Sequence, residues 1–205
     1  LLIFVSVLLV AGLILAGCAK PAPAPTEPIK IGVATCYAGP PGIYGQEATN
    51  GFELAVNEIN AAGGIKNLGG AKIKVVNADT ENKPDVAASE TERLINDEGA
   101  LAVVATFFTC MSVSSVAEKH HVTCFAPYTT TTDLTTRGYH YVFRGYSTVD
   151  KEAHEVLDTA MATFEKAGVE PKTCGLLYCT EACALSSINY IKETMPDLGI
   201  DICLL

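Results

Sequence analysis

A run of four threonines, residues 129–132, is the part of the sequence best suited to hold a small polar ligand, and Pro127 and Tyr128 precede it. A charged ligand that leaves water has to regain its hydrogen bonds, because an unpaired buried charge costs on the order of several kcal/mol. Hydroxyls and backbone N–H groups satisfy a carboxylate without adding a full charge. The same composition is typical of a solvent-exposed turn, in which threonine hydroxyls bond to the nearby backbone. The sequence alone leaves both interpretations open.

Cysteines are the second group of residues with chemical potential, and there are eight of them. If Cys18 carries lipid, seven cysteines remain. Because this number is odd, at least one cysteine is unpaired or pairs with a residue beyond Leu205. Their spacing lacks the close pairs of a zinc ribbon, so we predict no metal site. Several lie in apolar segments, where cysteine acts as a small hydrophobe. Whether each is free, paired or metal-bound stays open for Cys36, Cys110, Cys124, Cys174, Cys179, Cys183 and Cys203.

Motifs for catalysis are weak. The glycines within residues 39–45 lack the spacing of a dinucleotide-binding loop, and Pro40 interrupts them. There is no Gly-x-Ser-x-Gly elbow. We therefore predict that the protein is not an enzyme and uses no cofactor. The alternative is a thiol-dependent enzyme with a flavodoxin-like fold and Cys36 as its nucleophile, although no base accompanies this residue at a recognisable spacing.

The first residues resemble an export signal. Residues 1–17 are apolar and carry no charge, and they are fewer than the roughly 20 residues that a membrane-spanning helix needs. Small residues precede Cys18, as they do at a signal-peptide cleavage point, and the Leu-Ala-Gly-Cys order is that of a bacterial lipobox. We predict a signal peptide, incomplete at its start, over residues 1–17. The alternative is a hydrophobic core helix.

A proline-rich segment follows. Alternating prolines in residues 18–28 favour an extended, semi-rigid spacer that begins with the lipidated Cys18. Anchor and spacer together predict a protein held at the outer face of the cytoplasmic membrane or in the periplasm. The formal net charge of −9, without a basic cluster, argues against nucleic acid as a partner.

From residue 29 onward, apolar segments typical of strands alternate with amphipathic segments typical of helices. Strands are expected at residues 29–34, 71–77, 100–105, 122–126, 174–178 and 200–205. Helices are expected at residues 46–62, from residue 84, and at 111–121, 150–167 and 184–195, whereas the pattern breaks around 141–149. Apolar stripes should face inward at Phe52, Ala55, Val56 and Ile59, at Ala87, Leu94 and Ile95, and at Leu157, Ala160, Met161 and Phe164.

This alternation predicts an α/β fold with right-handed crossovers and doubly wound parallel sheets. In such sheets, ligands bind beyond the carboxyl ends of the strands, where helix N-termini supply unpaired N–H groups. The loops expected to form a binding site are residues 35–45, 106–110, 127–133 and 179–183.

Several ordered segments resemble the type I periplasmic binding proteins, in particular the branch that contains the leucine/isoleucine/valine-binding protein. They cover the chain after the spacer, in the order expected for that family. The matching stretches are Ile29-Lys30-Ile31-Gly32-Val33, Tyr44-Gly45, Asn50 through Ile65 (NGFELAVNEINAAGGI), Glu92-Arg93-Leu94-Ile95, Val116-Ala117-Glu118-Lys119, Asp133 through Tyr139 (DLTTRGY) and Tyr141-Val142-Phe143-Arg144.

The resemblance implies ligand contacts at defined positions. Tyr44 matches a tyrosine that packs against the ligand side chain, and Thr109 matches a Ser or Thr that binds the carboxylate, although Cys110 or Ser112 could take its place. Tyr128 and Thr130 match positions that bind the ammonium and carboxylate groups. Cys183 stands where the family commonly has a tyrosine, a difference that bears on which amino acid is bound.

The resemblance also implies the organisation of the whole protein. Two lobes joined by a hinge would close on the ligand, with the first lobe at residues 29–145, the hinge crossing and first helix of the second lobe at 146–172, and an incomplete second lobe at 173–205. We expect a monomeric, lipid-anchored receptor that passes a branched-chain amino acid, or a related amide or urea-like solute, to an ABC permease. The alternative is the extracellular sensor domain of a receptor with the same fold.

Overall fold

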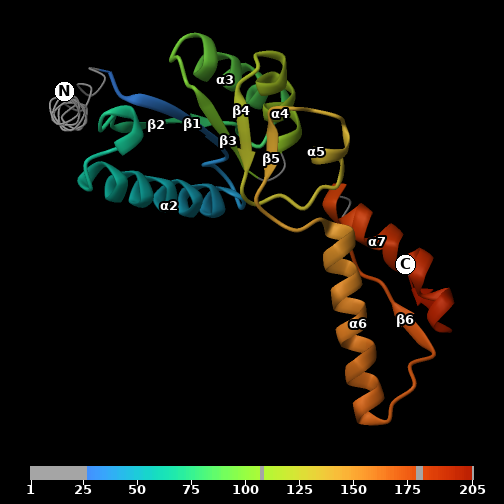
Figure 1. Ribbon diagram of the computed structural model, residues 1–205. Helices are drawn as coiled ribbons and strands as arrows, with labels where there is room; N and C mark the ends of the chain where they lie inside the picture. The colour runs from blue at the N-terminus through green and yellow to red at the C-terminus, as the bar shows by residue number, and fades with distance from the viewer. Residues whose placement is uncertain (1–26, 107–108, 179–181, 205) are drawn as a thin grey trace, which may run out of the picture. The chain divides into compact units, whose positions relative to one another are not determined.

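The computed structural model describes residues 27–106, 109–178 and 182–204 (Figure 1). The predicted signal peptide, most of the spacer and Cys18 lie outside these residues. Two compact units can be distinguished: residues 27–29 with 54–74, and residues 30–53 with 75–204. In the described part of the chain, no helix combines the length and the apolar character that crossing a membrane requires.

The main sheet has the strand order β2-β1-β3-β4-β5. Its strands are β1 (Ile29–Thr35), β2 (Ile73–Asp79), β3 (Ala102–Ala105), β4 (Thr123–Ala126) and β5 (Val142–Arg144). The pairs β1–β3, β3–β4 and β4–β5 are parallel. The predicted α/β architecture with a parallel sheet is thereby confirmed.

β5 corrects one prediction, because residues 141–149 were expected to break the pattern. The strand has only three residues, which is too short for a period-2 signal. Its pairing with β4 aligns Phe125 with Phe143, and Cys124 donates its N–H to the carbonyl of Tyr141 at 2.8 Å. Tertiary pairing therefore determines this strand.

One face of the sheet packs on α3 (Pro84–Asn96) and α4 (Cys110–Lys119) to form the main core. The sheet contributes small side chains, so the helices approach closely; a Cβ at Gly32 would lie 2.8 Å from Leu94 Cδ1. The predicted inward positions of Ala87 and Leu94 are confirmed, and Ile95 packs at the edge of the core. Fully buried members of this core are Ala34, Ala87, Leu94, Val103, Ala105, Val113, Ala117, Cys124, Ala126 and Leu134.

Helix α2 (Gly42–Ala61) begins four residues before the expected start at Gln46. Its predicted inward stripe is only partly correct: Phe52 and Val56 are half-buried, whereas Ala55 and Ile59 are exposed. The reason is that the buried contacts of this helix come from Gly42, Gly45 and Thr49 in its first two turns. Glycine contacts of this kind leave no apolar periodicity in the sequence.

The unit of residues 54–74 closes on itself through Asn60. Its side-chain amide donates to the carbonyl of Ile73 and accepts from the N–H of Ile73, each at 2.8 Å. The short helix η1 (Lys66–Leu68) lies between Asn60 and Ile73 in the sequence, and an isolated bridge pairs Ile65 with Ala71 on either side of it. Gly64 has a φ of +80°, and a Cβ there would lie 2.4 Å from the carbonyl oxygen of Ala71, so glycine is required.

The remaining elements are α5 (Asp133–Thr136), α6 (Val149–Ala167), β6 (Thr173–Gly175), α7 (Ala182–Thr194), η3 (Pro196–Leu198) and β7 (Asp201–Leu204). β6 and β7 pair in parallel, and Leu157, Met195 and Ile200 form a second core. In α6, Leu157 faces inward as predicted and Met161 packs at the margin, but Phe164 is exposed. The predicted stripe extends one turn too far, because the second core of the described residues includes Leu157 and Met161 but not Phe164.

Candidate ligand-binding site

The carboxyl ends of β1, β3 and β4 meet at one edge of the sheet. Their parallel pairing aligns Ala34 with Ala105 and Val104 with Phe125, so the loops that follow these strands begin beside one another (Figure 1). Loops at this edge are where parallel sheets place ligands. Three of the four loops selected from the sequence start here.

Buried threonines tie these strand ends together. Thr106 donates its hydroxyl to Thr35 Oγ1 at 2.6 Å, and both side chains are buried. Thr80, which follows β2, donates its N–H to the carbonyl of Thr35 at 2.8 Å. The sequence analysis placed Thr35 and Thr106 at the start of two candidate loops but did not single out their hydroxyls, and it did not select Thr80. A threonine at the end of each apolar strand is a signal that could have identified all three.

Thr109 and Cys110 lie at the start of α4, and both are buried. Cys110 Sγ lies 3.1 Å from Thr129 Oγ1 in a hydrogen bond. Burial raises the pKa of the Cys110 thiol, although the bond to Thr129 acts in the opposite direction, so the thiol stays neutral at physiological pH. Cys110 therefore joins the loop after β3 to the loop after β4.

The threonine loop, residues 129–132, is held by its carbonyl groups. The carbonyl of Thr130 accepts from Val149 N–H at 2.8 Å, and the guanidinium of Arg144 donates to the carbonyls of Thr131 at 2.9 Å and Thr132 at 3.4 Å. By contrast, the N–H and the hydroxyl of Thr130 have no hydrogen-bond partner among the described residues. Two donor groups at the carboxyl edge are thus available to an anionic ligand group.

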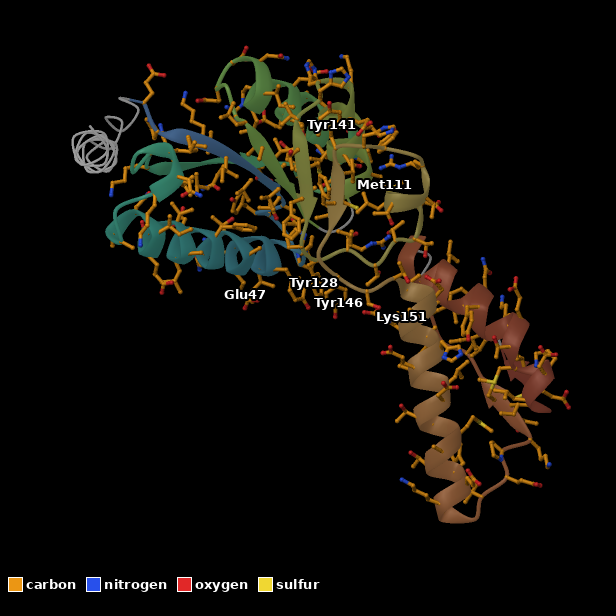
Figure 2. All side chains as sticks on the ribbon, in the orientation of Figure 1. Glu47, Met111, Tyr128, Tyr141, Tyr146 and Lys151 are labelled. Atoms are coloured by element: carbon orange, nitrogen blue, oxygen red, sulfur yellow. The ribbon has the colours of Figure 1, made fainter. Side chains whose placement is uncertain are left out.

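Two tyrosines flank the threonine loop. The ring of Tyr128 lies 4.8 Å from that of Tyr146, centroid to centroid, and Figure 2 shows the two side by side beyond β4 and β5. Both rings are about half exposed. The pKa of Tyr146 is raised, mainly by the carboxylate of Glu152 and then by Tyr128. Sequence reasoning missed Tyr146 because it lies in the segment without a recognisable pattern.

Tyr44 lies in the first turn of α2 with its ring 55% exposed. Gly45 brings this turn against β1: a Cβ at Gly45 would lie 1.8 Å from the carbonyl oxygen of Cys36, which no side chain tolerates. Tyr44 is therefore presented near the end of β1 by a close helix–loop contact. Its contact with the same ligand as Thr109 and Thr130 stays a prediction.

The last two predicted positions are less defined. Cys183 lies near the start of α7, and its side chain is not among those described, while Cys18 lies outside the described residues. Cys36, Cys110, Cys124, Cys174 and Cys203 are free thiols. Within the described ranges, no group of three or more His, Cys, Asp or Glu side chains is arranged to hold a metal ion.

Comparison with known proteins gives a consistent result. A family model described as "Periplasmic binding protein" matches residues 28–204. The Leu/Ile/Val-binding protein homolog 8 of Brucella abortus is 28% identical over 181 residues, which cover 86% of this chain and 44% of that protein. The Leu/Ile/Val-binding protein of Escherichia coli K12 is 33% identical over 120 residues, 58% of this chain and 32% of that protein.

A solved structure shows the same fold. The branched-chain amino acid transporter substrate-binding protein LivJ of Streptococcus pneumoniae, in complex with isoleucine, matches with a TM-score of 0.71 and 27% identity. The match covers 87% of this chain and 49% of that one. The chain thus spans about half the length of the proteins it matches, or less.

Proposed function

The chain belongs to the periplasmic binding protein family, and from this premise we propose that the protein is the substrate-binding component of an ABC importer for a small amino acid, branched-chain amino acids first. The family consists of substrate-binding proteins of transporters rather than enzymes. The relatives named above are a Leu/Ile/Val-binding protein, a homolog of that protein, and a branched-chain amino acid transporter protein solved in complex with isoleucine. A related amide or urea-like solute is the alternative ligand.

One observation carries this proposal: Thr130 offers an N–H and a hydroxyl, both without partners among the described residues, at the carboxyl edge of the sheet. An amino-acid carboxylate that leaves water needs such donors, and bonds to a charged group are the stronger kind. The carbonyl of Thr130 is already engaged by Val149. We assign the carboxylate to the donors of Thr130, with Thr109 beside α4 as a further contact, and the ammonium to the carbonyl of Tyr128.

The remaining contacts and the organisation belong to the same proposal. Tyr44 would pack on the ligand side chain, Cys110 would support Thr129, and Cys183 would be a further ligand contact. Residues 29–145 would form one lobe, and residues 173–205 would belong to a second lobe reached through residues 146–172. The protein would act as a monomer that delivers its ligand to a membrane permease.

A thermal-shift screen of the full-length protein against the protein amino acids and simple amides tests the function. Ligand that binds only the folded state raises the apparent stability by about 2.7 kcal/mol at a concentration 100 times the dissociation constant. Leucine, isoleucine or valine should therefore raise the melting temperature by several degrees. The absence of stabilisation by every compound in the panel would reject the proposed ligand class.

The membrane anchor is proposed from the lipobox order around Cys18. Expression of the complete gene in a bacterial host with a clickable fatty acid should label the protein, and Cys18→Ser should abolish the label and release the protein from the membrane fraction. Cys36→Ser is the matched control, because that thiol is buried in the fold. Equal labelling of the Cys18→Ser protein would exclude the anchor.

A further inference from the structure

The threonine loop is connected to the start of α6 as well as to the sheet. Thr132 donates its hydroxyl to Asp150 Oδ1 at 2.8 Å, and Val149 donates its N–H to the carbonyl of Thr130 at the same distance. Val149 and Asp150 are the first two residues of α6. Two residues of the loop, Thr130 and Thr132, therefore have a partner on this helix.

A second set of bonds connects the loop to the end of β5. The guanidinium of Arg144 contacts the carbonyls of Thr131 and Thr132 and also bonds to the hydroxyl of Thr135. Arg144 belongs to the last described strand of the main sheet. The loop is consequently held between a sheet residue and a helix that begins five residues later.

These bonds determine which groups of the loop remain for a ligand. Val149 holds the carbonyl of Thr130, whereas the N–H of Thr130 has no hydrogen-bond partner among the described residues. The hydroxyl of Thr132 is occupied by Asp150, whereas that of Thr130 has no partner among the described residues.

The charge of Asp150 suits this role. Its pKa is lowered, first by the hydroxyl of Thr132 and then by that of Thr148, so the carboxylate is ionised at neutral pH. A carboxylate in the first turn of a helix is also stabilised by the helix dipole. The hydrogen bond from Thr132 is therefore charge-assisted and is maintained by the fold of α6.

We propose that Asp150 is a positioning residue for the ligand site: through Thr132 it fixes the threonine loop to the first turn of α6, so that the Thr130 donors are held toward the ligand. The inference rests on the proposed function for its ligand, but not for its geometry. Because α6 is the first helix after the main sheet, a displacement of its first turn would be transmitted to the loop.

Two variants break the same bond from opposite sides. Asp150→Ala removes the acceptor, and Thr132→Val removes the donor without changing α6. Asp150→Asn keeps an oxygen that can accept the bond. Glu155→Ala, one turn further along α6, removes the same charge from an exposed position whose side chain has no partner among the described residues, and it serves as the control.

Hydrogen–deuterium exchange of the ligand-free full-length protein is the first measurement. The amides of Leu134, Thr135 and Val149, which donate to carbonyls of the threonine loop, should exchange about three to ten times faster in Asp150→Ala and in Thr132→Val, and at the wild-type rate in Asp150→Asn and Glu155→Ala. Unchanged exchange in both bond-breaking variants would overturn the proposal. So would an equal acceleration in Glu155→Ala, because loss of charge alone would then explain the effect.

Calorimetric titration with L-leucine is the second measurement. The Kd should rise about three- to tenfold in each bond-breaking variant. The Kd of the double variant should not exceed the higher of the two single-variant values, because the two residues act as one unit. Additive losses, or an unchanged Kd, would overturn the proposal. If the wild-type protein does not bind L-leucine, the proposed ligand is rejected, and the positioning role is then tested by the exchange rates alone.

Discussion

The residues around Thr130 are held by hydrogen bonds, while its own N–H and hydroxyl have no partner among the described residues. Thr129 is engaged by Cys110, Thr131 and Thr132 are held by Arg144, and Val149 takes the carbonyl of Thr130 itself. The hydroxyls of Thr129 and Thr132 bond to side chains within the protein, to Cys110 and Asp150. A role of Thr130 in ligand binding stays a prediction.

Thr130→Val should weaken L-leucine binding by about 10- to 100-fold, since a hydrogen bond to a charged group contributes about 1.5–3 kcal/mol. Calorimetry on the full-length protein measures this. The control is Thr159→Val on α6, where the hydroxyl bonds back to the carbonyl of Glu155 in the same helix. An unchanged affinity in Thr130→Val would remove this residue from the site.

Cys124 makes stability depend on pH. Burial raises the pKa of this thiol from 9.0 to about 12. The unfolded chain ionises the thiol first, so the stabilisation is complete below pH 9 and is lost as the pH rises toward 12. At pH 10 the loss should be about 1.4 kcal/mol relative to pH 7.

Urea unfolding at pH 7 and pH 10 under reducing conditions measures this loss. Other groups also titrate in this range, so the comparison is made with Cys124→Ala, whose stability should fall less between the two pH values. An equal fall in both proteins would contradict the effect assigned to Cys124. The sequence predicted that Cys124 lies in an apolar strand. Its full burial depends on packing against α3 and α4, and this packing could not be predicted from the sequence.

At the scale of elements, the long periodic segments could be predicted and the short ones could not. The helices α3 and α4 and the strands β1 and β3 have apolar patterns that are decided locally. β5 and α5 have three and four residues, and their formation depends on pairing with β4 and on burial of Leu134. The bonds from Arg144 to the threonine loop were missed for the same reason.

The start of α2 provides a prediction at this scale. Gly45→Ala would place a Cβ 1.8 Å from the carbonyl oxygen of Cys36, so the first turn of the helix must shift. We expect a loss of at least about 2 kcal/mol of stability, as for other steric clashes in a packed region, and weaker ligand binding through the displaced Tyr44. Urea denaturation and calorimetry measure the two effects.

Gly51→Ala in the same helix is the matched control. Nothing lies within 4 Å of its Cβ, so alanine should raise stability by about 0.5–1 kcal/mol through helix propensity. A loss of stability in Gly51→Ala, or none in Gly45→Ala, would refute this description of how α2 packs.

At the scale of the whole molecule, family membership could be inferred from the ordered set of segments, and the family model confirms it. The exact ligand could not be inferred, because ligand contacts come from side chains on several loops and Cys183 departs from the common pattern. The proposed two-lobe organisation stays a prediction, and the chain spans 49% of the matched LivJ chain.

Closure of two lobes predicts that the full-length protein becomes more compact when it binds its ligand. Small-angle X-ray scattering should show a smaller radius of gyration with saturating L-leucine than without it. D-leucine, which presents the same groups with the wrong stereochemistry, is the control. The same radius in the presence and absence of a bound amino acid would exclude closure.

The claim on which the rest depends is that an amino acid binds to the free donors of Thr130. Nuclear magnetic resonance of full-length protein labelled with 15N-threonine tests it directly. During titration with L-leucine, the Thr130 amide resonance should move downfield and saturate with the calorimetric Kd, while that of Thr159 stays in place. Saturable binding that leaves the Thr130 resonance unmoved would contradict the account.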